Sequence, residues 1–270
     1  MSKVIAAIDN SLAAQPTISS ALALGRLFDA EVELLHVMTD GQRNVRSAAE
    51  AAGLPLRTAP GPVAERLVEV GQARDVAALV IGSRGTPAGS RPLGSTALTT
   101  ATSLAKPVVV VPPDARPPAA FKRVLLPVEG DPSAAFPPRA IVELTRGAEI
   151  DVVVLHVHAE DSLPAFTDQP QHEQQAWARE FLRRYCPWGI GSVRLETRVG
   201  RVDELVLRAA EETRAELIIL DWAQELAAGR APVVRAVLGR GRTPVMLVPV
   251  AVPAEARDGD GAPAALLPVG

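Results

Sequence analysis

Aromatic residues and cysteines are scarce in this chain. Phe, Trp and Tyr make up 3% of its 270 residues, so the core must be built from Val, Leu, Ile and Ala. The single cysteine, Cys186, excludes an internal disulfide and suits a reducing compartment. No apolar run approaches the roughly 20 residues that span a bilayer, and the first residues lack the pattern of a signal peptide. We therefore expect a cytoplasmic protein without a membrane partner.

The patterns of several common functional classes are absent as well. With a net charge of -3, the chain offers no electrostatic basis for binding nucleic acid or a membrane surface. It contains neither the P-loop pattern G-x-x-x-x-G-K-S/T nor the dinucleotide-binding pattern G-x-G-x-x-G. No Ser-His-Asp arrangement, Cys-His relay or pair of carboxylates stands out. We therefore predict no catalytic residues.

What the chain does contain is an internal repeat. Residues 4–9 correspond to residues 124–129, and residues 32–37 correspond to residues 152–157, both at an offset of 120. Three later segments correspond in the same order at offsets of 137 to 139, namely residues 61–67 with 200–205, 79–81 with 218–220, and 107–112 with 244–249. Segments that match in one order indicate a duplication. We predict a first repeat over residues 1–113, a proline-rich linker over 114–120, a second repeat over 121–250 and a disordered tail over 251–270.

Each repeat alternates apolar strands with helical segments. In the first repeat we predict strands at residues 3–8, 31–38, 56–59, 77–81 and 108–111, and helices at 12–28, 43–52, 62–74 and 95–104. In the second repeat we predict strands at residues 123–128, 150–157, 193–199, 216–221 and 244–250, and helices at 133–146, 171–186, 202–214 and 232–239. Strands that alternate with helices imply right-handed crossovers and parallel pairing. The predicted fold class is α/β, with two tandem doubly wound five-stranded parallel sheets.

A glycine-bearing loop follows the fourth predicted strand of the first repeat. Residues 77–85, followed by residues 93–96, read as a strand, a loop and the first turn of a helix. Glycines let the backbone approach a ligand, and a helix N-terminus offers unpaired N–H groups and the positive end of its dipole. Ligands of doubly wound sheets bind beyond the carboxyl ends of the strands, where the strand order reverses. The residues predicted at that edge are Asp9, Val37, Gly82, Gly85 and Gly94.

These motifs together resemble the universal stress protein family. The motifs are residues 4–9, 34–37, 82–85, 93–95 and 106–112, and the resemblance covers both repeats, roughly residues 2–250. It implies a tandem-domain member in which each repeat has a five-stranded parallel α/β fold like that of the adenine nucleotide alpha hydrolases. Family members commonly dimerise through the last strand. In a tandem chain, this pairing would form internally between residues 108–111 and 245–250, and a further homodimer stays open.

The resemblance also implies a ligand. ATP-binding members of the family have a G-x2-G-x9-G-S/T loop and an aspartate that ends the first strand. Asp9 is therefore expected near the ribose, or near a phosphate through a nucleotide-bound Mg²⁺, which is the only metal contact expected. The backbones of Ala7 and Val37 are expected near the adenine.

The phosphate end of the implied site comes from the glycine loop. The resemblance implies that Gly82 and Gly85 lie under the ribose and phosphates, with Gly94, Ser95 and Thr96 at the phosphate tail. Eight residues rather than nine separate Gly85 from Gly94 in this sequence, and a one-residue deletion in an exposed loop is often absorbed. We therefore expect the first repeat to bind ATP.

The second repeat departs from this pattern. Asp221 and Trp222 stand where the loop should begin, Gly229 is the only glycine nearby, and Glu129 replaces the strand-end aspartate. A carboxylate at Asp221 would repel a phosphate in a partly desolvated site. Pro232 keeps a helix start, and we expect Trp222 to fill the space that the first repeat leaves for its ligand. No ATP is expected in this repeat.

The histidines invite a different interpretation, a metal site. His36 and His156 occupy equivalent strand positions in the two repeats, which favours a structural role. The pair His156 and His158 has no third ligand at a metal-binding spacing. We therefore predict no metal site here.

Three functions are consistent with these observations to different degrees. The first is a nucleotide-binding regulatory or signalling module of the stress response, which acts on an unknown protein partner and hydrolyses ATP slowly at most. The alternative is a dimerisation or scaffold protein that binds no nucleotide and in which both loops are structural. A true enzyme of a related nucleotide-binding superfamily would need a catalytic motif, such as HxGH, that the chain lacks. The shortened loop is the feature that separates the first two.

Overall fold

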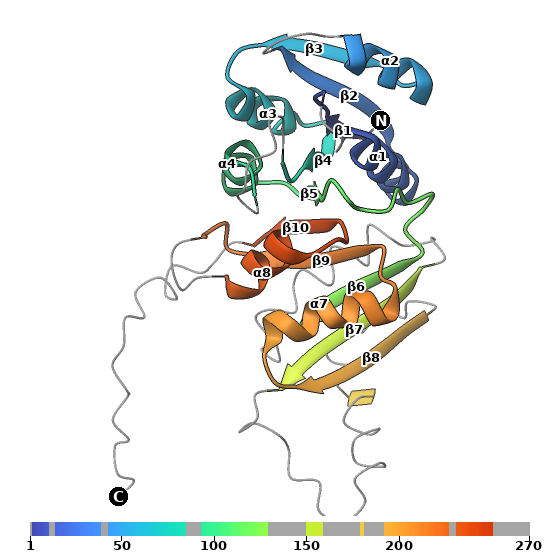
Figure 1. Cartoon of the computed structure of the whole chain (residues 1–270), viewed down its shortest axis with the longest axis vertical. Coiled ribbons are helices and arrows are strands. Elements are labelled where there is room, and N and C mark those ends of the chain that lie inside the picture. Colours follow the sequence, from blue (N-terminus) through green and yellow to red (C-terminus); the bar gives the residue numbers. More distant parts are fainter. Residues whose placement is uncertain are drawn as a thin grey trace, which may run out of the picture.

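Buried apolar strands form the core of this chain. A computed structural model describes residues 2–10, 14–38, 43–84, 93–128, 150–158, 179–180, 192–226 and 231–250. Within these ranges, ten strands join in one sheet (Figure 1). The runs of Val, Leu and Ile explain this arrangement, because strands that are apolar on both faces need cover on both sides.

The first half of the chain alternates strands and helices as predicted. Its elements are β1 (Lys3–Ala7), α1 (Ala14–Phe28), β2 (Glu31–Met38), α2 (Arg43–Ala52), β3 (Leu56–Pro60), α3 (Val63–Gly71), β4 (Val76–Gly82), α4 (Ser95–Ser103) and β5 (Val108–Val111). The prediction for α3 was too long at both ends. Pro62 precedes this helix as its N-cap, and the helix stops at Gly71. Turn hydrogen bonds from Ala73 N–H to Val70 O and from Val76 N–H to Ala73 O then lead the chain into β4.

The described part of the second half also follows the predicted order. Its elements are β6 (Arg123–Val128), β7 (Asp151–His158), β8 (Ser192–Val199), α7 (Val202–Thr213), β9 (Leu217–Trp222), α8 (Pro232–Arg240) and β10 (Val245–Pro249). The predicted helices at 133–146 and 171–186 lie outside the described residues, except for Arg179 and Glu180, which are helical. The predicted tail at 251–270 lies outside them as well.

The order of the strands repeats the same plan twice. Across the sheet it is β3-β2-β1-β4-β5-β10-β9-β6-β7-β8. In each half, the first three strands follow one another across the sheet in one direction. The fourth and fifth strands lie on the other side of the first strand. The order therefore reverses between β1 and β4, and again between β6 and β9. The short strand β3 lies at an outer edge.

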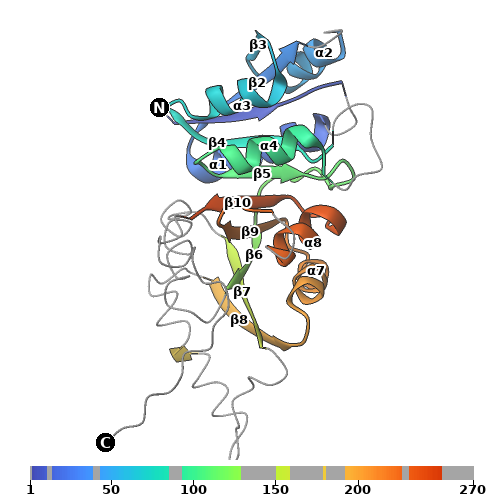
Figure 2. The ribbon, with the colours of Figure 1, turned by 90° about the vertical axis from the view of Figure 1, so that its left-hand side faces the viewer.

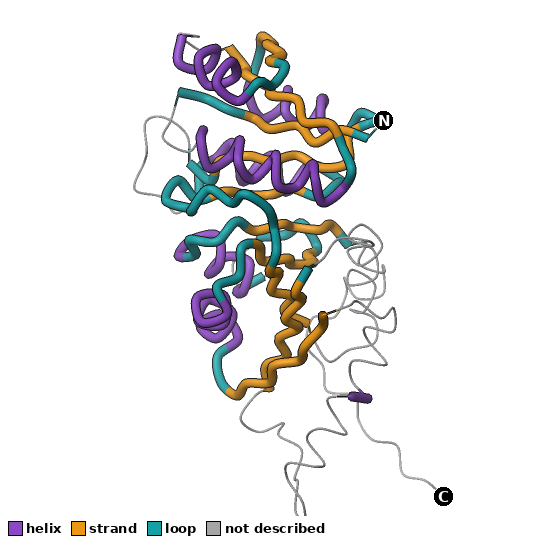
Figure 3. Tube along the Cα trace, turned by 90° about the vertical axis from the view of Figure 1, so that its right-hand side faces the viewer, coloured by secondary structure: helices purple, strands orange, loops and turns teal. Residues whose placement is uncertain are grey.

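The two halves meet where β5 and β10 lie side by side (Figures 2 and 3). This pair is antiparallel, whereas all other neighbouring strands described are parallel. Val109 pairs with Met246, its own counterpart in the repeat, and Val110 and Val108 pair with Val245 and Leu247. The predicted internal pairing of the last strands is thus confirmed, and its register gives the halves a local two-fold relation.

Two apolar clusters cover the faces of this sheet. One cluster joins the strands to α3, α4, α7 and α8, and it runs through both halves. The other joins the opposite face of the strands to α1 and α2. Alternate residues of each strand belong to opposite clusters, as Leu79 and Val80 do, because successive side chains point to opposite faces. The first half therefore has helices on both faces of its sheet.

Gly25 provides a test of how tightly α1 packs. A Cβ at this position would lie 2.6 Å from Val32 Cγ2 and 2.9 Å from the backbone oxygen of Ala30. Glycine to alanine in a helix usually stabilises by about 0.5–1 kcal/mol. Here we expect Gly25→Ala to destabilise the protein by about 1–3 kcal/mol, because the backbone must shift. Urea denaturation measures the sign of the change in the free energy of unfolding. An increase in stability would contradict the close packing around Gly25.

Gly71→Ala serves as the matched comparison for that test. A Cβ at Gly71 would meet the tip of the Leu104 side chain, with Cδ2 at 2.9 Å. A side-chain methyl can rotate or shift more readily than a backbone carbonyl. We therefore expect Gly71→Ala to cost less stability than Gly25→Ala.

Candidate functional site

A cavity of about 360 Å³ opens at the carboxyl ends of the strands in the first half. It lies at the point where the strand order reverses between β1 and β4. Besides the ends of β1, β2 and β4, its wall contains residues from the starts of α1, α3 and α4. Crevices at such reversals are where doubly wound sheets hold ligands.

Part of the cavity wall is apolar. Ala7 comes from β1, Leu35 and Val37 from β2, Ile81 from β4 and Leu67 from α3. Leu35, Ile81 and Leu67 belong to the buried cluster on this face. Because the neighbouring strands supply small and branched side chains, the walls are suited to a flat apolar group such as an aromatic ring.

Another part of the wall is built from backbone and hydroxyl groups. Gly82 ends β4 and Ser83 follows it, and Gly94 precedes α4, whose first residues Ser95 and Thr96 also line the cavity. The N–H of Gly94 donates to the oxygen of Ser83 over 2.8 Å, which ties the end of β4 to the start of α4.

The start of α4 is open to the cavity. Gly94 is the N-cap of α4 and has no side chain to cap it. The first N–H groups of a helix have no acceptor within the helix and carry the positive end of its dipole. Since Ser95, Thr96 and Ala97 line the cavity, this end can receive an anionic group.

Two charged residues also line the cavity. Asp9 follows β1 and Arg84 follows β4. An arginine can neutralise an anionic ligand and donate to its oxygens, whereas a carboxylate suits a ligand hydroxyl or a bound cation. Among the described residues, no three His, Cys, Asp or Glu side chains gather as a metal site would require.

Seven of the eight residues predicted for the site line this one cavity. They are Ala7, Asp9, Val37, Gly82, Gly94, Ser95 and Thr96. The eighth, Gly85, lies outside the described residues. Arg84, Thr17 and Leu35 line the cavity too, although they are not among the predicted site residues. The sequence does offer a signal for Arg84, because this residue stands between the two glycines of the loop. It offers no such signal for Thr17, which lies within α1.

The equivalent place in the second half is different. Asp221 pairs with Val248, and Gly82 pairs with Val111. The strand registers therefore align Asp221 with Gly82. Trp222 then corresponds to Ser83 of the cavity wall, and this indole is 4% exposed and belongs to the buried cluster. A large buried side chain thus stands where the first half has a small one that lines the cavity. Glu129 and Gly229 lie outside the described residues.

Helix α8, the counterpart of α4 in the second half, begins differently. Ala231 precedes α8 in a left-handed conformation with φ of 45°, and Pro232 is at the start of the helix. Proline has no N–H, so one of the free donors that α4 offers is missing from α8. The helix start itself is retained, as predicted.

The strand histidines make the same contact in both halves. Nδ1 of His36 lies 3.0 Å from the oxygen of Ile8, and Nδ1 of His156 lies 3.2 Å from the oxygen of Val128. Each ring therefore ties a second strand to the end of a first strand. His158 contacts His156 edge to face, with ring centroids 4.4 Å apart. Burial, with a smaller contribution from His156, lowers the pKa of His158 below its ordinary value.

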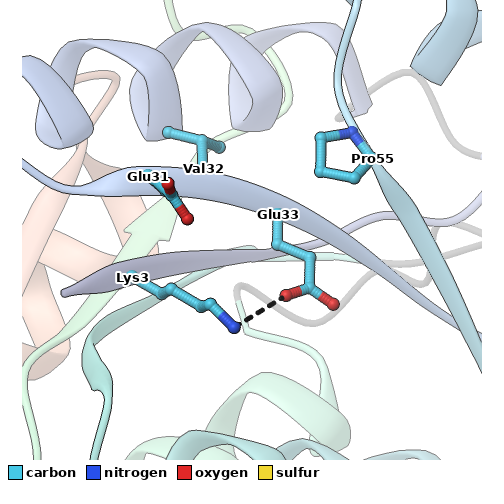
Figure 4. Close-up of a pocket in the computed structure, with 5 residues that line it drawn as sticks. All are labelled: Lys3, Glu31, Val32, Glu33 and Pro55. Carbon is cyan, nitrogen blue, oxygen red and sulfur yellow. Dashed lines mark ion pairs between the residues drawn. The ribbon is translucent and has the colours of Figure 1, made fainter. Parts of the chain in front are cut away.

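A second hollow lies at the opposite, amino-terminal edge of the first-half strands. It is lined by Lys3, Glu31, Val32, Glu33 and Pro55 (Figure 4). The ammonium group of Lys3 lies 3.8 Å from the Glu33 carboxylate and 3.1 Å from that of Asp75. Its acidic side chains are thus partly neutralised within the protein, and the hollow has neither a glycine loop nor a helix N-terminus.

Comparisons with known proteins agree with this fold. The model of the universal stress protein family matches residues 42–112 and 120–249. A universal stress protein from Archaeoglobus fulgidus is 18% identical, with 91% of this chain and 95% of that chain covered and a TM-score of 0.59. A functionally unknown protein from Pseudomonas aeruginosa PAO1 is 13% identical, with 92% of each chain covered and a TM-score of 0.63. At these identities, the two structures support the fold alone.

No curated protein sequence matches the chain. Among the described helices, none has the length and apolar character needed to cross a membrane. The family model matches two successive segments that together make up most of the chain, in agreement with the internal repeat. The chain therefore belongs to the universal stress protein family.

Proposed function

We propose that the cavity of the first half binds ATP and that this binding regulates a protein partner in the stress response. The observation that carries the proposal is the convergence of residues from several elements on one cavity. Ala7, Val37, Gly82 and Gly94 lie far apart in the sequence, yet all line it. The wall combines apolar side chains with groups that can bind an anion, and a nucleotide requires both.

The adenine would lie against the apolar part of the wall. Leu35, Val37 and Ile81 offer surfaces for a flat ring, and the backbone near Ala7 and Val37 supplies hydrogen-bonding groups for its edge. The ribose would then lie near Asp9, whose carboxylate can accept hydrogen bonds from its hydroxyls.

The phosphates would lie at the start of α4. There the first N–H groups of α4, the hydroxyls of Ser95 and Thr96 and the guanidinium of Arg84 can all donate to phosphate oxygens. Mg²⁺ would arrive with the nucleotide and reduce the repulsion between Asp9 and the phosphates. The residues present thus fit the ligand.

We propose binding and regulation, not turnover. Asp9 is the one carboxylate that lines the described cavity, and no histidine lines it. Hydrolysis needs a group that orients or deprotonates the attacking water, and among the described residues that line the cavity Asp9 is the one candidate for this role. We expect slow hydrolysis at most.

Calorimetry tests this proposal. The purified chain is first denatured, and any released nucleotide is identified by chromatography. The nucleotide-free protein is then titrated with ATP, with and without Mg²⁺. We expect one binding site per chain, because the buried Trp222 stands in the second half where Ser83 lines the cavity of the first. No binding at millimolar ATP with Mg²⁺ would contradict the proposal.

The alternative is a scaffold that binds no nucleotide. It is favoured by the sheet itself, which runs without interruption through both halves and would hold them rigidly without any ligand. The same titration separates the two functions, since a scaffold gives no heat of binding and releases no nucleotide.

A further inference from the structure

Gln224 of the second half reaches across to the first half. Its side-chain Nε2 donates to the backbone oxygens of Ala101 and Leu104, over 3.2 and 2.8 Å. These carbonyls belong to the last turn and the C-cap of α4. The last carbonyls of a helix have no partner within the helix, so the contact satisfies two of them.

The chemistry of the contact admits only one orientation of the amide. An NH₂ group has two hydrogens, one for each carbonyl, whereas the amide oxygen would face two acceptors. The donors also meet the negative end of the helix dipole. Gln224 is therefore matched to the C-terminus of α4.

The backbone of Gln224 is held in an unfavourable conformation. Its φ is 58°, in the left-handed region. For a residue other than glycine this costs on the order of 1–2 kcal/mol. Such conformations persist where neighbouring contacts enforce them. Here the buried Trp222 fixes the loop on one side, and the two hydrogen bonds fix the side chain.

The position of Gln224 in the repeat is informative. With Asp221 aligned on Gly82, Gln224 stands at the position of Gly85. The loop that carries the ligand glycines in the first half thus makes a contact between the halves in the second.

The composition and packing of helix α4 make such support valuable. Its nine residues include four threonines and two serines, which have weak helix propensity. It packs on the core mainly through Ala97, Thr100 and Ala101, whose small side chains interlock little. At about 1.5 Å per residue, the helix is short enough for a shift at one end to move the other.

We propose that Gln224 anchors α4 from the second half and thereby sets the phosphate end of the cavity in the first half. Ser95, Thr96 and Ala97 lie at the other end of the same helix and line the cavity. Gln224 is a positioning residue, since it is absent from the cavity wall and acts through α4. The ligand part of this inference rests on the proposed ATP binding, and the anchoring part does not.

Three single variants in the full chain test the anchor. Gln224→Met keeps the length of the side chain and removes both donors. Gln224→Glu keeps the shape and turns a carboxylate toward two carbonyls. Glu225→Gln changes the exposed neighbouring residue and is the control. Native-state hydrogen exchange of residues 95–104 is measured for each, together with calorimetric affinities for ATP and for adenosine.

We expect the hydrogen-exchange rate of residues 95–104 to rise about tenfold in Gln224→Met, because this variant loses roughly one net hydrogen bond. The rise should be larger in Gln224→Glu. ATP affinity should fall about fivefold to tenfold in Gln224→Met, while adenosine affinity stays unchanged because adenosine has no phosphate to meet α4. Glu225→Gln should match the wild type in every measurement.

Two results would overturn the inference. One is unchanged exchange in α4 when the donors of Gln224 are removed. The other is an equal loss of affinity for ATP and adenosine, which would indicate a general loss of stability. If the wild type binds neither compound, the proposed ATP function has failed, and the exchange data alone decide whether Gln224 anchors α4.

Discussion

Gly94→Val is expected to lower the affinity of the first half for ATP by at least about 100-fold, or about 2.7 kcal/mol. Gly94 lines the cavity through its backbone alone, beside the first N–H groups of α4. A branched side chain adds bulk to the wall at the point that the phosphates must approach. Its φ of -68° and ψ of 149° are allowed for valine, so the fold should survive the change. Calorimetric titration with ATP and Mg²⁺ measures the loss.

Two further variants sharpen this test. Gly82→Val should have the same effect, because Gly82 lines the cavity at the end of β4. Asp221→Val places the same residue at the matching position of the second half and should leave ATP binding intact. Binding that persists in both glycine variants, with thermal unfolding unchanged, would place the ligand elsewhere.

Val110→Asp is expected to prevent the chain from folding into a stable monomer. Val110 is 1% exposed and pairs with Val245 where the halves meet. A carboxylate there is buried without a partner, or takes up a proton and remains a buried polar group, and either outcome costs several kcal/mol. Because domains are stable by only about 5–15 kcal/mol, this loss approaches the whole stability.

Thr58→Asp is the matched control for this variant. Thr58 is exposed on the edge strand β3, so the same carboxylate should remain hydrated there. Urea denaturation and size-exclusion chromatography compare the two proteins. If Val110→Asp stays within about 1 kcal/mol of the wild type, β5 and β10 do not form a buried junction.

Most of the fold could be predicted from the sequence, because its strands are buried on both faces. A continuous apolar run such as β5 predicts a strand that is buried on both faces. Such runs occur at corresponding positions in both repeats, which strengthens each prediction. The end of α3 could not be predicted in the same way. Gly71 ends this helix, and the turn that follows depends on where β4 begins, which no local periodicity encodes.

The candidate site was predictable to the extent that topology determines it. Asp9, Val37 and Gly82 follow or end strands, so a reversal of strand order brings them together. Thr17 was not predictable, since its place in the wall depends on how α1 packs. The contact of Gln224 with α4 joins residues more than a hundred positions apart, and only the pairing of β5 with β10 brings them within reach.

The antiparallel junction of β5 and β10 has a consequence for how the two halves can diverge. In a symmetric homodimer each substitution occurs twice, so a change that blocks one site blocks both. Here the same two-fold arrangement is made by one gene product, and each half can change alone. Trp222 and Pro232 occupy positions whose counterparts, Ser83 and Ser95, line the cavity. Covalent tandem repeats thus permit a permanent division of labour, at fixed one-to-one stoichiometry and independent of protein concentration.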